Sequence, residues 1–272
     1  MEVSGDTDLP LTERMRNRSK DQHDKSDRLV NLKLALVLTS KPLYAEAISL
    51  FWPIYRELEL LLQKNKEHPQ LGRFQPLLPC LRRAHLFEND MRALLGDKSS
   101  AEQLMSRRIY EEEGREKFCP PELQEYIDHL RKLSDDDPLL LLPYAYSMYS
   151  AILAGGSIIK RMVRKAFSLK TDEGVETFTV LLEGSSFKNI ADFRSALKRA
   201  LNDEMEIADH DKERIVDETP KVFIRNNKLV ATVKDTDVFQ EVWGECRRYL
   251  LVILSLAVAI VGIRLFQVYG YP

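Results

Sequence analysis

The sequence predicts an all-α domain followed by a C-terminal transmembrane helix. Helix start signals and apolar residues at helical spacing recur along the chain, whereas strand signals are almost absent. Near the C-terminus, the uncharged run over 249–263 is long enough to cross a bilayer of about 30 Å. Charged residues make up 30% of the 272 positions, yet the formal net charge is only -2, so a nucleic-acid partner has no electrostatic support.

The helices can be placed from their start signals and from apolar residues that recur every three or four positions. These signals predict helices over 11–28, 41–66, 74–95, 120–132, 139–167, 186–211 and 220–230. Pro53 is expected to kink the helix over 41–66 rather than end it. The run 135–137, three aspartates, is expected to supply negative charge at the N-terminus of the helix over 139–167. Residues 228–244 hint at a short strand, but we interpret them as a connector.

An adjacent glycine pair, Gly155 and Gly156, lies inside the apolar helical segment over 139–167, with no turn residue beside it. Each glycine costs a helix interior about 1 kcal/mol relative to alanine, so two in succession need a reason. One explanation is a close helix crossing or a kink. The other is a large, flat ligand that contacts the bare backbone.

The predicted organisation comprises a disordered tail, a helical domain, a linker and a membrane anchor, over 1–10, 11–230, 231–246 and 247–268. Arg247 and Arg248 precede the apolar run and only a few residues follow it, so the arginines are expected to stay cytoplasmic. The N-terminus lacks the apolar run of a signal peptide, and three scattered cysteines favour a reducing compartment. We therefore expect a tail-anchored protein whose helical domain faces the cytosol.

Three segments carry a resemblance to a known family. They read LTERMRNRSKDQHDKSDR around His23, NKEHP after the helix that holds Tyr55, and AYSMYSAILAGGSIIKRMVRKAF around the glycine pair. In their order and separations they resemble the heme oxygenase family over about residues 11–230. The apolar C-terminus is also similar to that of the animal membrane-anchored members. The resemblance implies a heme oxygenase-like multi-helix domain that holds heme between two helices.

The resemblance also implies roles for individual residues. His23 corresponds to the histidine that ligates the heme iron, and a neutral imidazole suits iron. Gly155 and Gly156 correspond to distal glycines that let the backbone approach the porphyrin, and Tyr55 to a tyrosine of the distal hydrogen-bond network. The other heme-binding positions implied are Arg16, Tyr146, Arg194 and Lys198 near the propionates, and Phe223 and Asn226 on the last heme-lining helix. Taken one at a time, the basic residues could equally form a solvated face and the aromatic ones a core.

The distal segment departs from the family at positions that bear on catalysis. Most members read Arg-Tyr-Leu-Gly-Asp-Leu where this chain reads Met-Tyr-Ser-Ala-Ile-Leu over 148–153. Ile152 replaces an aspartate that anchors distal water in the family, and isoleucine cannot hold water by hydrogen bonding. Ala151 replaces the first glycine, whereas Met148 is interpreted as a packing residue rather than an iron ligand. We therefore expect slower turnover and more than one biliverdin isomer.

The resemblance implies an enzyme, a heme oxygenase in which heme is both substrate and cofactor. The expected products are biliverdin, carbon monoxide and ferrous iron. Dioxygen is the expected oxidant, and the electrons are expected to come from NADPH through NADPH-cytochrome P450 reductase. The family also favours the endoplasmic reticulum membrane as the location, with the tail anchor holding both proteins on one surface.

The alternative is a non-catalytic, membrane-anchored heme-binding protein of the same fold that stores or senses heme. Its support is the missing aspartate and the dipeptide Cys119-Pro120, which resembles heme-responsive motifs. A third possibility, a di-iron site on Glu204, Glu206 and His210, is disfavoured because the paired Glu-x-x-His pattern on two helices is missing. Formation of biliverdin separates the first two functions.

Overall fold

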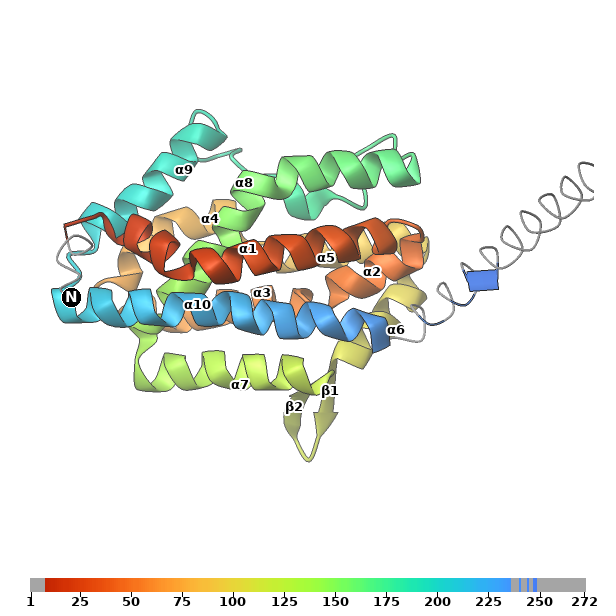
Figure 1. Ribbon diagram of the computed structural model, residues 1–272, viewed down its shortest axis with the longest axis horizontal. Coiled ribbons are helices and arrows are strands. Elements are labelled where there is room, and N and C mark those ends of the chain that lie inside the picture. Colours follow the sequence, from red (N-terminus) through yellow and green to blue (C-terminus); the bar gives the residue numbers. More distant parts are fainter. Residues whose placement is uncertain (1–7, 236–239, 241–243, 245–246, 249–272) are drawn as a thin grey trace, which may run out of the picture. The chain divides into compact units, whose positions relative to one another are not determined.

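The computed structural model describes residues 8–235 together with residues 240, 244, 247 and 248 (Figure 1). The chain divides into two compact units between Thr232 and Val233, and the first unit holds the helical domain. Apart from Arg247 and Arg248, the expected anchor over 247–268 lies outside the described residues.

The described chain is almost entirely helical, as the sequence predicts. Its α-helices are α1 (Leu11–Val37), α2 (Lys41–Ser49), α3 (Trp52–Lys64), α4 (Leu78–Leu81), α5 (Ala84–Leu95), α6 (Lys98–Arg108), α7 (Pro121–Asp136), α8 (Leu142–Phe167), α9 (Ile190–Arg199) and α10 (Asp209–Ala231). Shorter helical turns are η1 (Leu71–Leu77), η2 (Pro138–Leu141), η3 (Glu176–Phe178), η4 (Ala200–Glu204) and η5 (Thr232–Asp235). An antiparallel hairpin of β1 (Ile109–Glu112) and β2 (Arg115–Phe118) completes the described structure.

The long helices α1 and α10 run side by side (Figure 1). The N-terminal part of α1 is anchored by buried apolar residues, among them Leu11 and Met15. Its middle meets α10 chiefly through polar contacts, including Ser26 Oγ, which donates to Asn227 Oδ1 at 2.7 Å. Helix α8 packs on α10 and η3, and α3 packs on α5 and α7. The core between these helices is filled by large side chains with almost no exposure, among them Ile54, Leu58, Leu62, Phe74, Tyr126 and Tyr149.

The prediction of one helix over 41–66 with a kink at Pro53 is wrong. The segment forms two separate helices, α2 and α3. Pro53 lies in the first turn of α3, where the missing N–H costs nothing. The expected helix over 74–95 is likewise divided into η1, α4 and α5, with Pro79 in the first turn of α4. In both places proline begins a helix instead of bending one.

Four other expectations about the elements differ from the structure. Pro220 lies inside α10 rather than at its start, because buried residues on both sides of it, such as Val216 and Val222, keep the helix packed through the proline. Asp135 and Asp136 end α7 instead of starting the glycine-bearing helix. The segment over 228–244 is interpreted above as a connector, but its part up to Asp235 is helical. The helix over 186–211 is also interrupted after η4.

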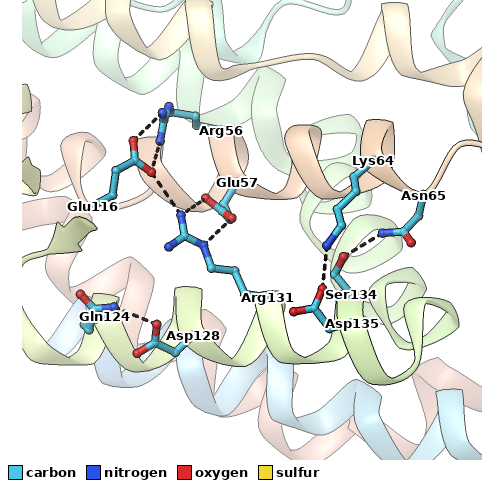
Figure 2. A network of polar contacts seen from close by, with 10 residues as sticks. All are labelled: Arg56, Glu57, Lys64, Asn65, Glu116, Gln124, Asp128, Arg131, Ser134 and Asp135. Carbon is cyan, nitrogen blue, oxygen red and sulfur yellow. Dashed lines mark hydrogen bonds and ion pairs between the residues drawn. The ribbon is translucent and has the colours of Figure 1, made fainter. Parts of the chain in front are cut away.

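The hairpin was not predicted, and a network of ion pairs holds it to the helices (Figure 2). Glu116 of β2 accepts hydrogen bonds from Arg56 of α3 at 2.8 Å and from Arg131 of α7 at 3.2 Å. Arg131 also donates to Glu57 of α3 at 2.7 Å. Hydrogen bonds from Arg56, and then from Arg131, outweigh the effect of burial and lower the pKa of Glu116. The hairpin is therefore tied to both helices by charge.

Within the described residues, one helical segment, Pro138–Phe167, is long and apolar enough to cross a membrane. Of its most apolar window, 61% is buried inside the domain. A core helix of a globular domain meets the same criteria, and the burial identifies this segment as such a helix.

Candidate functional site

One face of α8 leaves the core and becomes open. Met148, Ala151, Gly155, Ile158 and Met162 follow one another at spacings of three and four residues, so they share one face of the helix. We call this row the α8 stripe. Met148 is only 4% exposed, whereas Ile158 and Met162 are 58% and 41% exposed. A methyl group built on Gly155 would meet no atom within 4 Å, so the backbone at the centre of the stripe is accessible.

The neighbouring Gly156 faces the interior instead. A Cβ atom on Gly156 would lie 3.3 Å from the Phe178 ring, which is tighter than most such contacts. Phe178 belongs to η3, and η3 is fixed by Asp90, whose carboxylate accepts the backbone N–H groups of Glu176 at 2.7 Å and Thr177 at 2.9 Å. Each glycine therefore fits a different explanation. Gly156 permits close packing within the domain, and Gly155 leaves bare backbone that a flat ligand could contact.

His23 lies in the middle of α1 with its side chain 53% exposed. Its Nδ1 atom is 3.4 Å from Asp27 Oδ2, one turn further along the same helix. Its ring packs edge-on against Phe223 of α10, with 5.4 Å between the ring centroids. Asp24 Oδ1 also lies 4.0 Å from Nδ1. His23 is therefore accessible, and it is oriented by nearby carboxylates, of which Asp27 is the nearer, and by one aromatic ring.

Helix α10 connects the imidazole to the α8 stripe. Asn226 lies one turn after Phe223, on the same face of α10. Its Nδ2 atom donates to Met148 Sδ at 3.3 Å. The same face of α10 thus touches His23 through Phe223 and the inner end of the stripe through Asn226.

Basic residues gather around Tyr146, at the start of α8. Burial raises the pKa of the Tyr146 hydroxyl, and hydrogen bonding with Thr12 and Ser150 and the charges of Arg194 and Arg16 oppose that rise. Arg16 lies two turns before His23 on the same face of α1. The structure therefore brings Arg16, Tyr146 and Arg194 together.

These cations have no acidic partners in the described chain. Arg16 and Arg194 form no ion pair there, whereas their neighbours Arg18 and Arg199 pair with Asp217 and Glu204. Lys198 is exposed and lies one turn after Arg194 on the same face of α9, but no contact joins it to Tyr146. The cluster offers unpaired positive charge to an anion.

Tyr55 lies behind α8 and is 5% exposed. Its hydroxyl donates to the carbonyl oxygen of Met148 at 3.1 Å, and its ring packs on those of Phe87 and Tyr149. Burial raises the pKa of this hydroxyl, so it stays protonated. Ile152, also buried, packs beside Gly156 and brings no polar group to this region.

The residue types at this site fit an iron porphyrin. A carboxylate beside Nδ1 is the usual way to orient an imidazole that binds a metal through its other nitrogen. The stripe offers an apolar face with bare backbone, and unpaired cations suit carboxylates. In contrast, no cluster of three or more His, Cys, Asp or Glu residues in the described chain could hold a metal ion, so nothing supports the di-iron alternative.

Sequence reasoning missed the full α8 stripe, because it stopped at the glycines although Ile158 and Met162 continue the spacing.

Comparison with known proteins identifies a family model described as "Heme oxygenase", which matches residues 9–232. Heme oxygenase 2 of Macaca fascicularis is 28% identical over 223 residues, which are 80% of this chain and 64% of that protein. The chain thus spans less than two thirds of that relative's length. Heme oxygenase 1 of a Synechocystis strain is 26% identical over 220 residues, 80% of this chain and 82% of the relative.

Solved structures of heme oxygenases also superimpose on this chain. The heme-free structure of heme oxygenase 2 from Chlamydomonas reinhardtii superimposes with a TM-score of 0.72 at 27% identity, covering 83% of this chain and 98% of that one. Heme oxygenase-1 from Synechocystis in complex with heme superimposes with a TM-score of 0.68 at 24% identity, over 92% of this chain and all of that one. The second match bears on the fold alone.

Proposed function

The chain belongs to the heme oxygenase family, and we propose that it is itself an active heme oxygenase. In this proposal heme is cleaved to biliverdin, carbon monoxide and ferrous iron with dioxygen and reductase-supplied electrons. The observation that carries the proposal is the convergence of an accessible imidazole, an open glycine-bearing helix face and unpaired cations on one side of the domain. Each is a binding feature for a different part of the heme molecule.

His23 is the proposed iron ligand. Its Nδ1 faces Asp27, which leaves Nε2 free to bind iron as a neutral imidazole. Phe223 limits rotation of the ring from the other side. These contacts orient the imidazole before heme arrives.

The heme carboxylates are proposed to meet Arg16, Arg194 and Lys198, with Tyr146 beside them. Charge-assisted hydrogen bonds from arginine to a carboxylate are short and directional. Because these cations lack acidic partners in the described chain, heme binding breaks no ion pair to reach them. They would fix which edge of the ring enters first, and so which carbon faces the reacting oxygen.

Bound heme supplies the iron at which dioxygen is activated, and the protein supplies position and protons. Gly155 lets the backbone of α8 lie close to the ring, which Gly156 does not do directly because it packs on Phe178. Tyr55 fixes the carbonyl of Met148 and remains a neutral donor. Since Ile152 offers no carboxylate for distal water, proton delivery depends on other groups. This is the basis for expecting slow turnover and more than one biliverdin isomer.

The location and the electron donor are also part of the proposal. We infer a tail anchor over 247–268 that holds the protein on the endoplasmic reticulum membrane with the helical domain in the cytosol. NADPH-cytochrome P450 reductase on the same membrane would then supply electrons. The arginine pair before the apolar run supports this orientation.

The second candidate is a membrane-anchored protein that binds heme without cleaving it. It is favoured by one feature of α8: Met148, at the inner end of the α8 stripe, and Ile152 are both buried, and neither side chain carries a charge. Both candidates share the binding site, so only turnover separates them.

The test uses the full chain in detergent, titrated with hemin and then reduced in air with the reductase and NADPH. We expect a Soret band with one equivalent of hemin, followed by its loss and the appearance of biliverdin. His23→Ala should shift the Soret band and abolish turnover, whereas His210→Ala, at a histidine 75% exposed on α10, should change neither. A stable Soret band under turnover conditions would support the heme carrier, and equal spectra for wild type and His23→Ala would overturn the ligand assignment.

A further inference from the structure

A pocket of about 430 Å³ lies between the hairpin and α7. In Figure 1 the hairpin and α7 lie at the opposite edge of the domain from the open part of α8. The pocket is lined by residues of β2 and α7, namely Arg115, Glu116, Lys117, Gln124, Asp128 and Arg131. All of these side chains are polar or charged, and none belongs to the proposed heme site. The pocket is large enough for a small molecule, and its lining suits a charged one.

Two of the charged groups are held by ion pairs within the protein (Figure 2). Arg131 donates to Glu57 at 2.7 Å and to Glu116 at 3.2 Å, and its guanidinium carbon lies 5.1 Å from the centroid of the Phe118 ring. Glu116 is also paired with Arg56 at 2.8 Å. The charges of Glu116 and Arg131 are therefore compensated before any ligand binds.

The other two cations of the pocket have no such compensation. Arg115 and Lys117 are two positions apart on β2, so their side chains leave the strand on the same face. Neither side chain forms an ion pair or a hydrogen bond in the described part of the chain, and this includes Glu112, which lies opposite Arg115 in the hairpin register. Two like charges on one wall repel each other, and an anion would relieve that repulsion.

The wall formed by α7 carries one carboxylate without a cationic partner. Gln124 is fixed at both ends of its amide, because Oε1 accepts from the backbone N–H of Phe118 at 2.8 Å and Nε2 donates to Asp128 Oδ1 at 2.9 Å. Asp128 forms no ion pair among the described residues. It lowers the positive charge of the pocket without cancelling it, since two unpaired cations outnumber one unpaired carboxylate.

A group with two negative charges matches the two free cations. A phosphate monoester carries about 1.5–2 negative charges at pH 7 and three acceptor oxygens. The fork of an arginine can hold two of those oxygens, and a lysine supplies a point charge. A single carboxylate would compensate only one of the two cations.

We infer that the pocket between β2 and α7 binds the phosphate monoester of a small molecule through Arg115 and Lys117. The binding is non-covalent, and heme takes no part in it, so this inference does not depend on the proposed function. A ligand that contacts both β2 and α7 also stabilises the hairpin against local opening.

The test titrates the full chain in detergent with glycerol 3-phosphate at constant ionic strength and records the heat of binding. We expect saturable binding with a Kd on the order of 1 mM, because a few exposed charged contacts give modest affinity. Inorganic phosphate should bind with similar affinity, since the phosphate group makes the contacts. Acetate should bind about tenfold more weakly. Saturation by inorganic phosphate but not by glycerol 3-phosphate would overturn the assignment to a monoester.

Variants of the lining residues should change the affinity in opposite directions. Arg115→Met and Lys117→Met should each weaken binding of glycerol 3-phosphate about tenfold, and Arg115→Lys should weaken it less, because the charge remains. Asp128→Asn should strengthen binding about threefold, because it removes the unpaired negative charge. The matched control is Lys132→Met, which removes an exposed cation of α7 outside the pocket and should match wild type.

The charge of the ligand predicts a pH dependence. Lowering the pH from about 7.5 to about 5 should weaken binding of glycerol 3-phosphate about fivefold, because a monoester loses its second charge near pH 6. Sulfate keeps both charges over this range and should keep its affinity. No histidine lines the pocket, so the loss arises from the ligand.

Heat without saturation would overturn the inference. So would acetate that binds as tightly as glycerol 3-phosphate, or Lys132→Met that weakens binding as much as Arg115→Met. His23→Ala should bind glycerol 3-phosphate like wild type, and Arg115→Met should bind hemin like wild type. Failure of the proposed function is thus a different result, in which the chain forms no biliverdin but still binds the phosphate.

Discussion

Gly155 and Gly156 are adjacent in the chain but have opposite surroundings. A side chain at Gly155 would enter open space on the α8 stripe, and one at Gly156 would press on Phe178. Both lie inside a regular helix, and neither has a positive φ. Their backbone geometry therefore does not demand glycine, and the reason for each lies in what surrounds it.

Gly155→Leu and Gly156→Leu should consequently fail in different ways. Leucine at Gly155 should leave the free protein as stable as wild type or up to about 1 kcal/mol more stable, since glycine is the poorer helix former. It should weaken hemin binding at least tenfold, because the side chain fills the open face. Leucine at Gly156 should cost about 1–3 kcal/mol through overpacking against η3. Urea unfolding of both variants measures the change in stability, and hemin titration measures the change in affinity.

If Gly155→Leu binds hemin as tightly as wild type, the α8 stripe is not the heme face. If Gly156→Leu is fully stable, Phe178 is free to move away and η3 does not support α8.

The role of a residue could be predicted from the sequence only where the residues around it belong to the same helix. His23 with Asp27 one turn away, and Arg16 on the same face, follow from helical spacing alone. That Gly156 faces Phe178, or that the Tyr55 hydroxyl reaches the carbonyl of Met148, depends on how η3 and α3 pack against α8. No spacing within one segment contains that information.

The short turn η3 supports α8 from inside, and Asp90 of α5 holds η3. Asp90 is 1% exposed and accepts two backbone N–H groups of η3. Burial raises the pKa of Asp90 to about 6, although the hydrogen bonds from Thr177 and Glu176 oppose the rise and the Glu176 charge adds to it. Ionisation of the Asp90 carboxylate therefore costs more free energy in the folded protein than in the unfolded chain.

This cost predicts a pH dependence with a defined sign. Between pH of about 4 and 6 the folded chain keeps a proton on Asp90 that the unfolded chain has lost, so the stabilisation due to that proton is greatest at low pH and disappears as pH rises through about 6. Relative to Asp90→Asn, the unfolding free energy of wild type should fall by up to about 3 kcal/mol from pH 4 to pH 7. Urea unfolding of both proteins across that range measures the difference, and parallel curves would contradict it.

Three of the errors in the predicted elements involve prolines. Pro53 and Pro79 begin helices, whereas Pro220 lies inside one, although all three interrupt similar apolar patterns. Sequence shows that a proline removes one backbone donor. Whether the helix continues past it is decided by side chains from other elements, and for α10 these come largely from α1.

The all-α architecture was predictable because almost every segment carries the helical period, which is a local property. The hairpin was not, because its strands contain few β-branched residues and are held by Arg56 and Arg131 from α3 and α7 (Figure 2). The relation of the helical domain to a membrane also stays a prediction, since the relevant residues are not described.

Deleting residues 247–272 tests the proposed anchor directly. The full chain should remain in the membrane fraction after carbonate extraction, whereas the deleted chain should be recovered in the supernatant with unchanged hemin binding, because the helical unit ends at Thr232. Reductase-driven turnover on membranes should fall when the anchor is removed, since the two proteins lose their shared surface. Release of the full chain by carbonate would exclude a transmembrane anchor.

Between Ser19 and Leu34, helix α1 has no buried side chain, and the turns that carry His23 meet α10 mainly through polar groups. Few apolar contacts mean a low free energy of local opening. The backbone amides of these turns should therefore exchange with deuterium faster than those of α10 opposite them. A ligand that bridges α1 and α8 would slow this exchange. We therefore expect the α1 wall of the proposed heme site to open locally in the free protein and to become ordered when the ligand binds.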